Sequence, residues 1–465
     1  MTVDDMDRYE IVQALREISL RDPSQFSLDG DNEPIDHKAI SGVYYTNWSK
    51  YSRPKHLPRE IDFNLYTHLF YAFYHVDGTT GELKSTDEWA DYQAPVEGAE
   101  SHPNHPEGNL GELFLLKLQN QFKVLLSVGG WSNREEFTEA MQDETKVKRL
   151  SKTLVDTMFK YGFDGIDFDW EYPSENGEDS KNFTKLIDSV RFSLDMIETK
   201  VYGSPKRRFE ITVAIPGTDD NLKGFEFHKL IPLVDYWNVM CYDYAGEWSE
   251  RTGYHCNLYN PRSRENGENF SAHRSIALLC NKYNIPRNKL VMGIAAYGRS
   301  FTNVQVDNEY PIYIDRIFRG VGNGGGEGSS SSEEGMWQYN DLPINGTTEE
   351  FDPIYGSAYC FDRRSKTFVG YDNYQSVQMK SEYAWRNDLA GLFMWESLGD
   401  RGITKKESLM EVFVKDIRYQ LKPTWSIFAE QKMIEYYVSK YPTDGYLTKY
   451  LQYLLQHLNS EGQLI

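Results

Sequence analysis

The stretch FDGIDFDWEYP, residues 163–173, decides the fold class and points to the chemistry. It places three carboxylates, Asp167, Asp169 and Glu171, at alternate positions, with large apolar residues between them. Side chains of an extended strand alternate between its two faces, so one face carries a row of acids and the other a row of core residues. A buried row of like charges is costly unless it serves a purpose. The stretch therefore predicts a catalytic strand.

Seven further apolar segments of strand length accompany this stretch, and amphipathic helical runs separate most of them. The eight segments span residues 39–48, 66–76, 122–131, 163–171, 209–217, 235–244, 289–298 and 389–397. Strands that alternate with helices predict a parallel sheet, and eight such units predict a (β/α)8 TIM barrel of the α/β class. The active site of this fold lies at the carboxyl ends of the strands. The residues at these ends include Glu171, Trp48, Trp131, Asp243 and Trp395.

The connection between the seventh and eighth strands is too long for a single helix, and it contains the low-complexity loop 322–335. We expect a small α+β insertion there, on the rim of the barrel. The predicted domains are an N-terminal extension (1–38), the catalytic barrel (39–301 and 369–418), the insertion (302–368) and a C-terminal helical tail (419–465). We expect the tail to pack on the barrel, with a partner interface as the alternative.

Composition limits the class of partner. The formal net charge of −20 argues against nucleic acid and against an anionic membrane surface. No apolar run reaches the length of a transmembrane helix, and the visible N-terminus has no signal core. Two locations stay open, the cytoplasm and a secreted or cell-wall site reached after signal removal. Cys256 and Cys280 could form a disulfide in a secreted protein. We expect a monomer without a metal or other cofactor.

The row of acids has a chemical consequence. Carboxylates this close together cannot all ionise freely, so we expect a shared proton and a protonated Glu171, which is a general acid. A glycosidase with two catalytic carboxylates needs them on opposite sides of the bond. Asp243 is the candidate for the opposite side, and without it the substrate must supply the nucleophile. Asp164 lies three positions before Asp167, so it is predicted to point to the opposite face of the strand and to be structural. A calcium loop of the EF-hand type is disfavoured, because its glycine and final glutamate are missing.

The stretch resembles a known family signature. DGIDFDWEYP is similar to the DxxDxDxE motif of glycoside hydrolase family 18, the class V chitinases, through Asp164, Asp167, Asp169 and Glu171. The other resembling segments are VYYTNW (43–48), SVGGW (127–131), MCYDYAGEW (240–248), AAYGRSF (295–301), GLFMWE (391–396) and, in the insertion, GMWQYNDLP (335–343). The likeness covers residues 40–418 and is greatest to fungal enzymes of the bacterial type.

The resemblance implies a chitinase that hydrolyses β-1,4-linked N-acetylglucosamine polymers, chitin or chitooligosaccharides, with retention and with assistance from the substrate. Glu171 would be acid and base, Asp169 would bind the 2-acetamido N–H, Asp167 would tune Asp169, and Tyr242 would hold the acetamido oxygen. The substrate-binding residues that it implies are Trp395, Trp131, Met240, Asp243, Trp248, Tyr44, Trp48, Tyr297 and Arg299.

Several of these assignments have alternatives. Core packing explains Tyr44 and Trp48 as well as ligand contact does, and Arg299 could be an ion-pair anchor for the barrel rim. Two other functions also remain open. One is a catalytically weak chitin-binding lectin-like protein, although such proteins usually lose the final acids that this chain keeps. The other is an endo-β-N-acetylglucosaminidase that acts on N-glycans.

Overall fold

The computed structural model describes residues 38–99, 104–175, 177–260, 270–306, 313–325, 333–401, 408–416 and 420–457. The predicted N-terminal extension, up to residue 37, therefore lies outside the described residues. Most of the glycine- and serine-rich run in the insertion, residues 326–332, also lies outside them.

Eight parallel strands form a closed barrel, as the sequence predicts. They are β1 (Lys38–Thr46), β2 (His68–Val76), β4 (Lys123–Gly129), β5 (Gly165–Asp169), β6 (Glu210–Pro216), β7 (Tyr236–Met240), β8 (Leu290–Ala295) and β14 (Gly391–Trp395). They follow one another in chain order around the sheet, and β1 pairs with both β14 and β2. This double pairing removes the free edges of the sheet. The prediction of a TIM barrel is confirmed.

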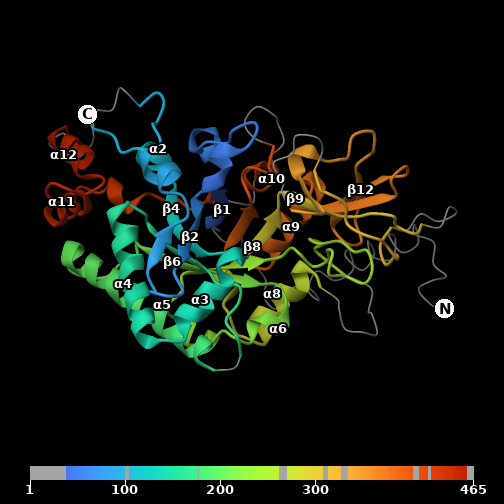
Figure 1. The fold of residues 1–465 in the computed structure, drawn as a ribbon, viewed down its shortest axis with the longest axis horizontal. Coiled ribbons are helices and arrows are strands. Elements are labelled where there is room, and N and C mark those ends of the chain that lie inside the picture. Colours follow the sequence, from blue (N-terminus) through green and yellow to red (C-terminus); the bar gives the residue numbers. More distant parts are fainter. Residues whose placement is uncertain are drawn as a thin grey trace.

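Helices cover the outside of the barrel (Figure 1). They are α2 (Gly108–Gln119), α3 (Arg134–Met141), α4 (Glu144–Lys160), α5 (Glu178–Tyr202), α6 (Asp219–Leu222), α7 (Phe227–Leu230), α8 (Ala272–Asn281), α9 (Tyr374–Arg386) and α10 (Leu409–Val414). Most of the longer ones present one apolar stripe to the sheet, which is the pattern of a helix that packs on a core.

The two faces of β5 separate as the alternation of its residues requires. On the apolar face, Phe168 meets Phe183 of α5 edge to face at 5.9 Å. Just past the strand, Trp170 stacks on Phe137 of α3 at 5.0 Å. Burial of these rings between sheet and helices contributes about 2 kcal/mol for each large side chain. The opposite face, which carries Asp167 and Asp169, is left to the barrel interior.

A second, antiparallel sheet stands between β8 and β14. Its strands, in spatial order, are β10 (Met336–Gln338), β9 (Tyr297–Phe301), β13 (Thr367–Tyr371), β12 (Ser357–Asp362) and β11 (Glu350–Asp352). β9 starts two residues after the end of β8, so the sheet grows directly from the mouth of the barrel. In Figure 1 it lies on the opposite side of the barrel from helices α11 and α12.

The C-terminal segment packs on the amino-terminal end of the barrel. Strand β15 (Gln420–Leu421) continues the sheet beside the start of β1, and it leads to helices α11 (Gln431–Lys440) and α12 (Thr448–Gln456). Tyr437 of α11 and Leu451 of α12 are buried in the main core. We call residues 420–457 the tail. Short antiparallel strand β3 (Leu83–Ser85) flanks β2 on the outside.

Cys256 and Cys280 do not form a disulfide: all four cysteines of the chain, including Cys241 and Cys360, carry free thiols. Within the described ranges, no helix combines the length and the apolar character that crossing a bilayer would need.

Candidate functional site

The candidate site is the row of acids at the carboxyl end of β5. Asp167 and Asp169 lie within the strand and are buried, whereas Glu171 lies two residues beyond its end and is partly exposed. Glu171 was predicted to belong to the strand itself. The strand stops at Asp169, so Glu171 stands at the mouth of the barrel.

Asp167 is held by hydrogen bonds from both neighbouring strands. The strand register pairs it with Ser127 of β4 and Thr212 of β6, and their hydroxyls donate to it at 2.7 and 2.5 Å. Tyr44 Oη donates to the same carboxylate at 2.9 Å, and Asn238 Nδ2 donates at 3.3 Å. Complete burial raises the pKa of Asp167, and these four donors oppose the rise. Asp167 is therefore fixed in place from four sides.

Asp169 and Glu171 have a different environment. Burial raises the pKa of Asp169 well above its usual range, and the charges of Glu171 and Asp167 add to this effect. Its Oδ1 is buried and has no hydrogen-bond partner among the described residues. Burial likewise raises the pKa of Glu171 to about 7, with a contribution from the charge of Asp243. A carboxyl group with this pKa keeps its proton near neutral pH, as a general acid must.

Asp243 lies just past the end of β7 (Tyr236–Met240) and is already committed to other groups. Its Oδ1 accepts hydrogen bonds from Arg299 Nε at 2.5 Å and Tyr297 Oη at 2.7 Å. Burial raises the pKa of Asp243, but the positive charge and the hydrogen bond of Arg299 oppose burial, and this pKa lies well below its usual range. Asp243 is thus an ionised, paired carboxylate and is a poor candidate for a second catalytic acid or nucleophile.

Aromatic side chains gather at the mouth. Tyr44, Tyr242 and Tyr297 belong to one buried cluster, against which Met240 and Trp395 pack while they remain partly exposed. The Trp395 ring stacks on Phe73 at 5.7 Å. Three further indole rings stand exposed around this cluster: Trp48 (47%), Trp131 (61%) and Trp248 (56%). Exposed indole faces around a buried acid are suited to the apolar faces of sugar rings.

The structure brings the predicted site residues together but gives some of them unexpected contacts. Tyr44 is buried and donates its hydroxyl to Asp167, so it supports a carboxylate. Tyr297 and Arg299 are also buried, and both bind Asp243. Arg299 additionally lies over the Trp248 ring, 4.9 Å from its centroid.

Several supporting residues were missed. Ser127, Thr212 and Asn238 all serve Asp167, and His255 contacts Asp243. The three partners of Asp167 lie on strands that the sequence located, but which of their residues point inward depends on the register of the barrel. Glu396 was also missed. Burial raises its pKa to about 7, and it accepts a hydrogen bond from the backbone N–H of Leu398.

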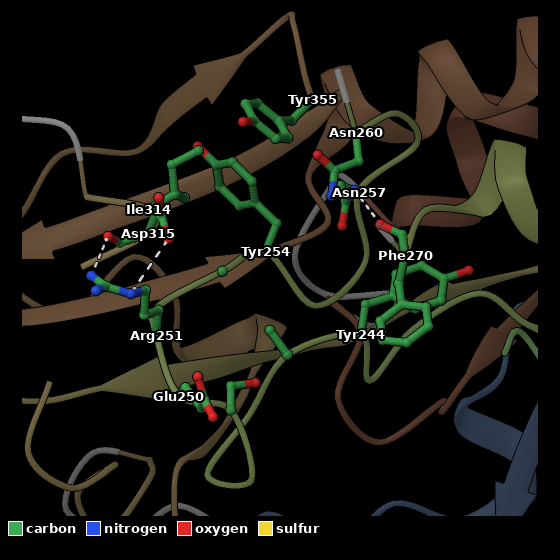
Figure 2. A pocket seen from close by; sticks show the side chains of 13 residues that line it. Tyr244, Glu250, Arg251, Tyr254, Asn257, Asn260, Phe270, Ile314, Asp315 and Tyr355 are labelled. Atoms are coloured by element: carbon green, nitrogen blue, oxygen red, sulfur yellow. Dashed lines mark hydrogen bonds and ion pairs between the residues drawn. The ribbon is translucent and has the colours of Figure 1, made fainter. Parts of the chain in front are cut away.

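A pocket of about 60 Å³ lies beside this site, between the loop after β7 and the insertion. Figure 2 shows Arg251 of the loop directed toward Asp315, with Tyr254 and Tyr355 nearby. Arg251 Nη1 donates to the backbone oxygen of Asp315 at 3.3 Å, and Tyr254 Oη donates to Asp352 at 3.1 Å. These contacts join the loop to the insertion. None of the carboxylates of the acid row lines this pocket.

The geometry can perform acid–base chemistry from one side. It offers a carboxylic acid with a pKa near 7 (Glu171), a second buried acid with a free oxygen beside it (Asp169), and an ionised carboxylate already paired with an arginine (Asp243). Because Asp243 is already paired, the part of the chain that the structure describes offers no free opposing carboxylate of the kind that a two-carboxylate glycosidase uses. Protonation of a leaving group is therefore available, and a nucleophile has to come from elsewhere.

Known proteins share this sequence and fold. The family model described as Glycosyl hydrolases family 18 matches residues 41–400. Sporulation-specific chitinase 2 of Saccharomyces cerevisiae is 38% identical over 452 residues, which cover 92% of this chain and 86% of that protein. Chitinase 1 of Aphanocladium album is 32% identical over 362 residues, 77% and 81% of the two chains. Among solved structures, chitinase ChiA74 from Bacillus thuringiensis has a similar fold, with a TM-score of 0.71 at 24% identity, covering 81% of this chain and 69% of that chain.

Proposed function

The chain belongs to glycosyl hydrolases family 18 and is a glycoside hydrolase of the chitinase class, and on this basis we propose that it hydrolyses the β-1,4 bonds of chitin or chitooligosaccharides with retention. The 2-acetamido group of the substrate acts as the nucleophile. One observation carries the proposal: the buried Oδ1 of Asp169 has no hydrogen-bond partner among the described residues, next to a Glu171 with a pKa of about 7. An acceptor in that position suits an amide N–H of the substrate.

In the first step, Glu171 gives its proton to the glycosidic oxygen. The bond between this oxygen and the anomeric carbon breaks, and its electron pair stays with the leaving sugar. The acetamido carbonyl oxygen forms a new bond to the anomeric carbon, which gives an oxazolinium ion. Asp169 accepts a hydrogen bond from the acetamido N–H and stabilises the positive charge that develops on the acetamido group. The pairing of Asp243 with Tyr297 and Arg299 supports this route, because it leaves that carboxylate unsuited to act as the nucleophile.

In the second step, Glu171 acts as a base. It removes a proton from water as the water oxygen attacks the anomeric carbon, and the bond to the acetamido oxygen breaks. Two displacements at one carbon restore the original configuration. Asp167 tunes Asp169, since the charge of Asp167 raises the pKa of its neighbour, and the Tyr242 hydroxyl holds the acetamido oxygen.

The aromatic residues bind the sugar chain. Trp395 forms the floor of the central subsite, since its ring lies at the mouth and is backed by Phe73. Trp131 and Trp248 flank further sugars, and Trp48 extends the surface. Met240 and Asp243 line the acetamido pocket. We propose that Tyr44 acts through Asp167, because its hydroxyl is committed there. We also propose a monomer, which light scattering of the purified enzyme would test.

Chitohexaose and a Glu171→Gln variant test the proposal. We expect the wild type to release short N-acetylglucosamine oligomers whose initial anomer is β by NMR, and the variant to be nearly inactive. Cellohexaose, which lacks the acetamido group, should not be cleaved by either protein. Undiminished turnover by the variant, or an initial α anomer, would contradict the mechanism. Tight binding by the wild type without product would favour the lectin-like alternative, and a preference for N-glycans would favour the endo-β-N-acetylglucosaminidase.

A further inference from the structure

His255 is a buried residue whose place in the fold suggests a role. It lies in the loop after β7, is completely buried, and sits between Asp243 and Tyr297. Its ring packs against the Tyr297 ring at 4.8 Å. Burial lowers the pKa of His255, and the negative charge of Asp243 opposes this effect. The other charged groups that face it are Arg299 of β9 and Asp372 after β13.

The two ring nitrogens of His255 have distinct partners, which fixes the tautomer. Nε2 lies 3.1 Å from the backbone oxygen of Tyr297. A carbonyl oxygen can only accept, so Nε2 must carry the hydrogen. In the neutral ring Nδ1 is then an acceptor, and the backbone N–H of Asp243 donates to it at 3.4 Å. The imidazole therefore links the backbone at the end of β7 to the backbone at the start of β9.

Asp243 needs such a link because its backbone is strained. Its φ of 56° lies in the left-handed region, which non-glycine residues rarely adopt. This conformation turns its carboxylate toward Tyr297 and Arg299. Nδ1 of His255 lies 3.7 Å from the same carboxylate oxygen. Because Nδ1 is an acceptor in this tautomer, it makes no hydrogen bond with that oxygen, and the imidazole holds Asp243 through its backbone N–H.

The loop that carries His255 is attached to the insertion. Thr252 donates its hydroxyl to the backbone oxygen of Tyr313 at 2.6 Å, and its backbone N–H donates to the backbone oxygen of Arg316 at 2.9 Å. The neighbouring Arg251 meets Asp315 in the same region (Figure 2). The backbone oxygen of His255 accepts from the Tyr244 N–H at 2.9 Å. The loop is therefore held at both ends, and a change of the His255 side chain leaves its backbone contacts in place.

We propose that His255 is a positioning residue for the reaction, which holds Asp243 in its left-handed conformation and so places the Asp243 carboxylate beside Glu171 and the acetamido pocket. This inference rests on the proposed function. It assigns His255 no contact with substrate. Its effect passes through Asp243, whose charge is one cause of the raised pKa of Glu171.

Three variants separate the link from Nδ1 to the Asp243 backbone from the link from Nε2 to the Tyr297 backbone. His255→Asn keeps an acceptor near the Nδ1 position, His255→Gln keeps a donor near the Nε2 position, and His255→Ala removes both. We expect kcat on chitohexaose to fall about tenfold or more in the alanine and glutamine variants, because small misplacements of a catalytic group have effects of this order. The asparagine variant should recover most of kcat. KM should change less than kcat, since the exposed indoles are untouched.

A pH profile adds a second measurement that a purely structural role would not change. Displacement of the Asp243 charge should lower the pKa of Glu171, so the alkaline limb of kcat/KM should move to lower pH in His255→Gln and not in His255→Asn. The matched control is His273→Gln, at a partly buried histidine whose Nδ1 meets Tyr383 Oη at 3.1 Å, away from Asp243. This control should keep the wild-type profile.

The outcomes distinguish the two proposals. If Glu171→Gln retains full activity, the proposed function fails whatever the histidine variants do. If Glu171→Gln is inactive while His255→Ala, folded by circular dichroism, keeps the wild-type kcat and pH profile, the role of His255 alone is wrong. Equal losses in the asparagine and glutamine variants would also contradict the assignment, because they would mean that the link to Asp243 is not the important one.

Discussion

The two ends of the signature strand carry acids in opposite circumstances. At the amino end, Asp164 is completely buried and both its oxygens are occupied. Lys117 Nζ and the Val124 N–H donate to Oδ2 at 2.8 and 3.0 Å, and Ser426 Oγ and the Ile427 N–H of the tail donate to Oδ1 at 2.7 and 2.9 Å. At the carboxyl end, Asp169 keeps a buried oxygen without a partner among the described residues.

A second pair of acids shows the same contrast. Glu210, at the amino end of β6, meets His68 Nε2 and Lys123 Nζ at 2.7 Å each, and Lys422 of the tail lies 3.6 Å away. Burial alone would raise the pKa of Glu210, but the positive charges of Lys123 and Lys422 and the hydrogen bond with His68 hold it well below the usual range. Glu171, at the other end of the barrel, has a pKa raised to about 7. In a TIM barrel, polar groups at the amino end serve stability and those at the carboxyl end serve catalysis.

The largest expected effect separates these two roles directly. Glu171→Gln removes the general acid, and we expect kcat on chitohexaose to fall by roughly 10³-fold, within the usual range for acid–base catalysis. The melting temperature should not fall, because the substitution removes a carboxyl group that is costly to ionise where it stands. Activity assays and thermal unfolding of the same preparation measure both quantities. A variant that loses stability together with activity would break the comparison.

Asp164→Asn should show the reverse pattern. It leaves the buried Lys117 without its negative partner, and breaking a buried ion pair costs about 3 kcal/mol of the free energy of unfolding. Denaturant unfolding measures the loss, and kcat at a temperature where the variant stays folded should change little. The double variant Lys117→Met, Asp164→Asn is the control, and it should recover part of the stability. No recovery would mean that the uncompensated lysine is not the cause.

The sequence could predict the barrel because its signals are local. Eight apolar runs, the alternation of acids with Ile166, Phe168 and Trp170, and the motifs at the strand ends all lie within short windows. It could also separate Asp164 from Asp167 by parity. It could not find the partners of these acids, because those contacts depend on register and on distant chain segments. Ser426 lies 262 residues after Asp164, and nothing in the tail's own pattern indicates that contact.

The backbone conformation of the loops could be predicted even less well from the sequence. Whether Asp243 faces Arg299 or solvent depends on the left-handed backbone conformation at that position. No residue pattern in the sequence predicts this conformation. The role of Tyr44 illustrates the same limit. Its strand was located, but the direction of its hydroxyl toward Asp167 follows from the closure of β1 against β14 and β2.

The pH dependence of activity and stability should also differ between the acids at the two ends of the barrel. Glu171 must be protonated to act, so kcat/KM should fall about tenfold per pH unit above an inflection near pH 7. Because the pKa of Glu171 is raised in the folded state, the contribution of Glu171 to the free energy of unfolding is fully present below its unfolded-state pKa. This contribution is lost as pH rises through 7. The lowered pKa of Glu210 acts the other way: its contribution is present above its unfolded value and is lost in acid, as pH falls through the folded value.

Profiles of kcat/KM and of melting temperature against pH test this prediction. Glu396 needs a control, because its pKa is also raised to about 7. The alkaline inflection of kcat/KM should persist in Glu396→Gln. Its disappearance there would assign the inflection to Glu396 and would remove the argument that Glu171 is the titrating acid.

The smallest expected effect concerns the tail. Ser426→Ala removes one of the two hydrogen bonds to Asp164 Oδ1 and leaves that of the Ile427 N–H. One lost hydrogen bond costs about 1 kcal/mol, so denaturant unfolding should show a small loss with unchanged kcat/KM. Ser439→Ala is the matched control, since the hydroxyl of this tail serine donates within its own helix, to the Tyr436 oxygen. A loss of kcat/KM without a loss of stability would mean that the tail influences the geometry of the acid row through β5. The two ends of the strand would then not be independent.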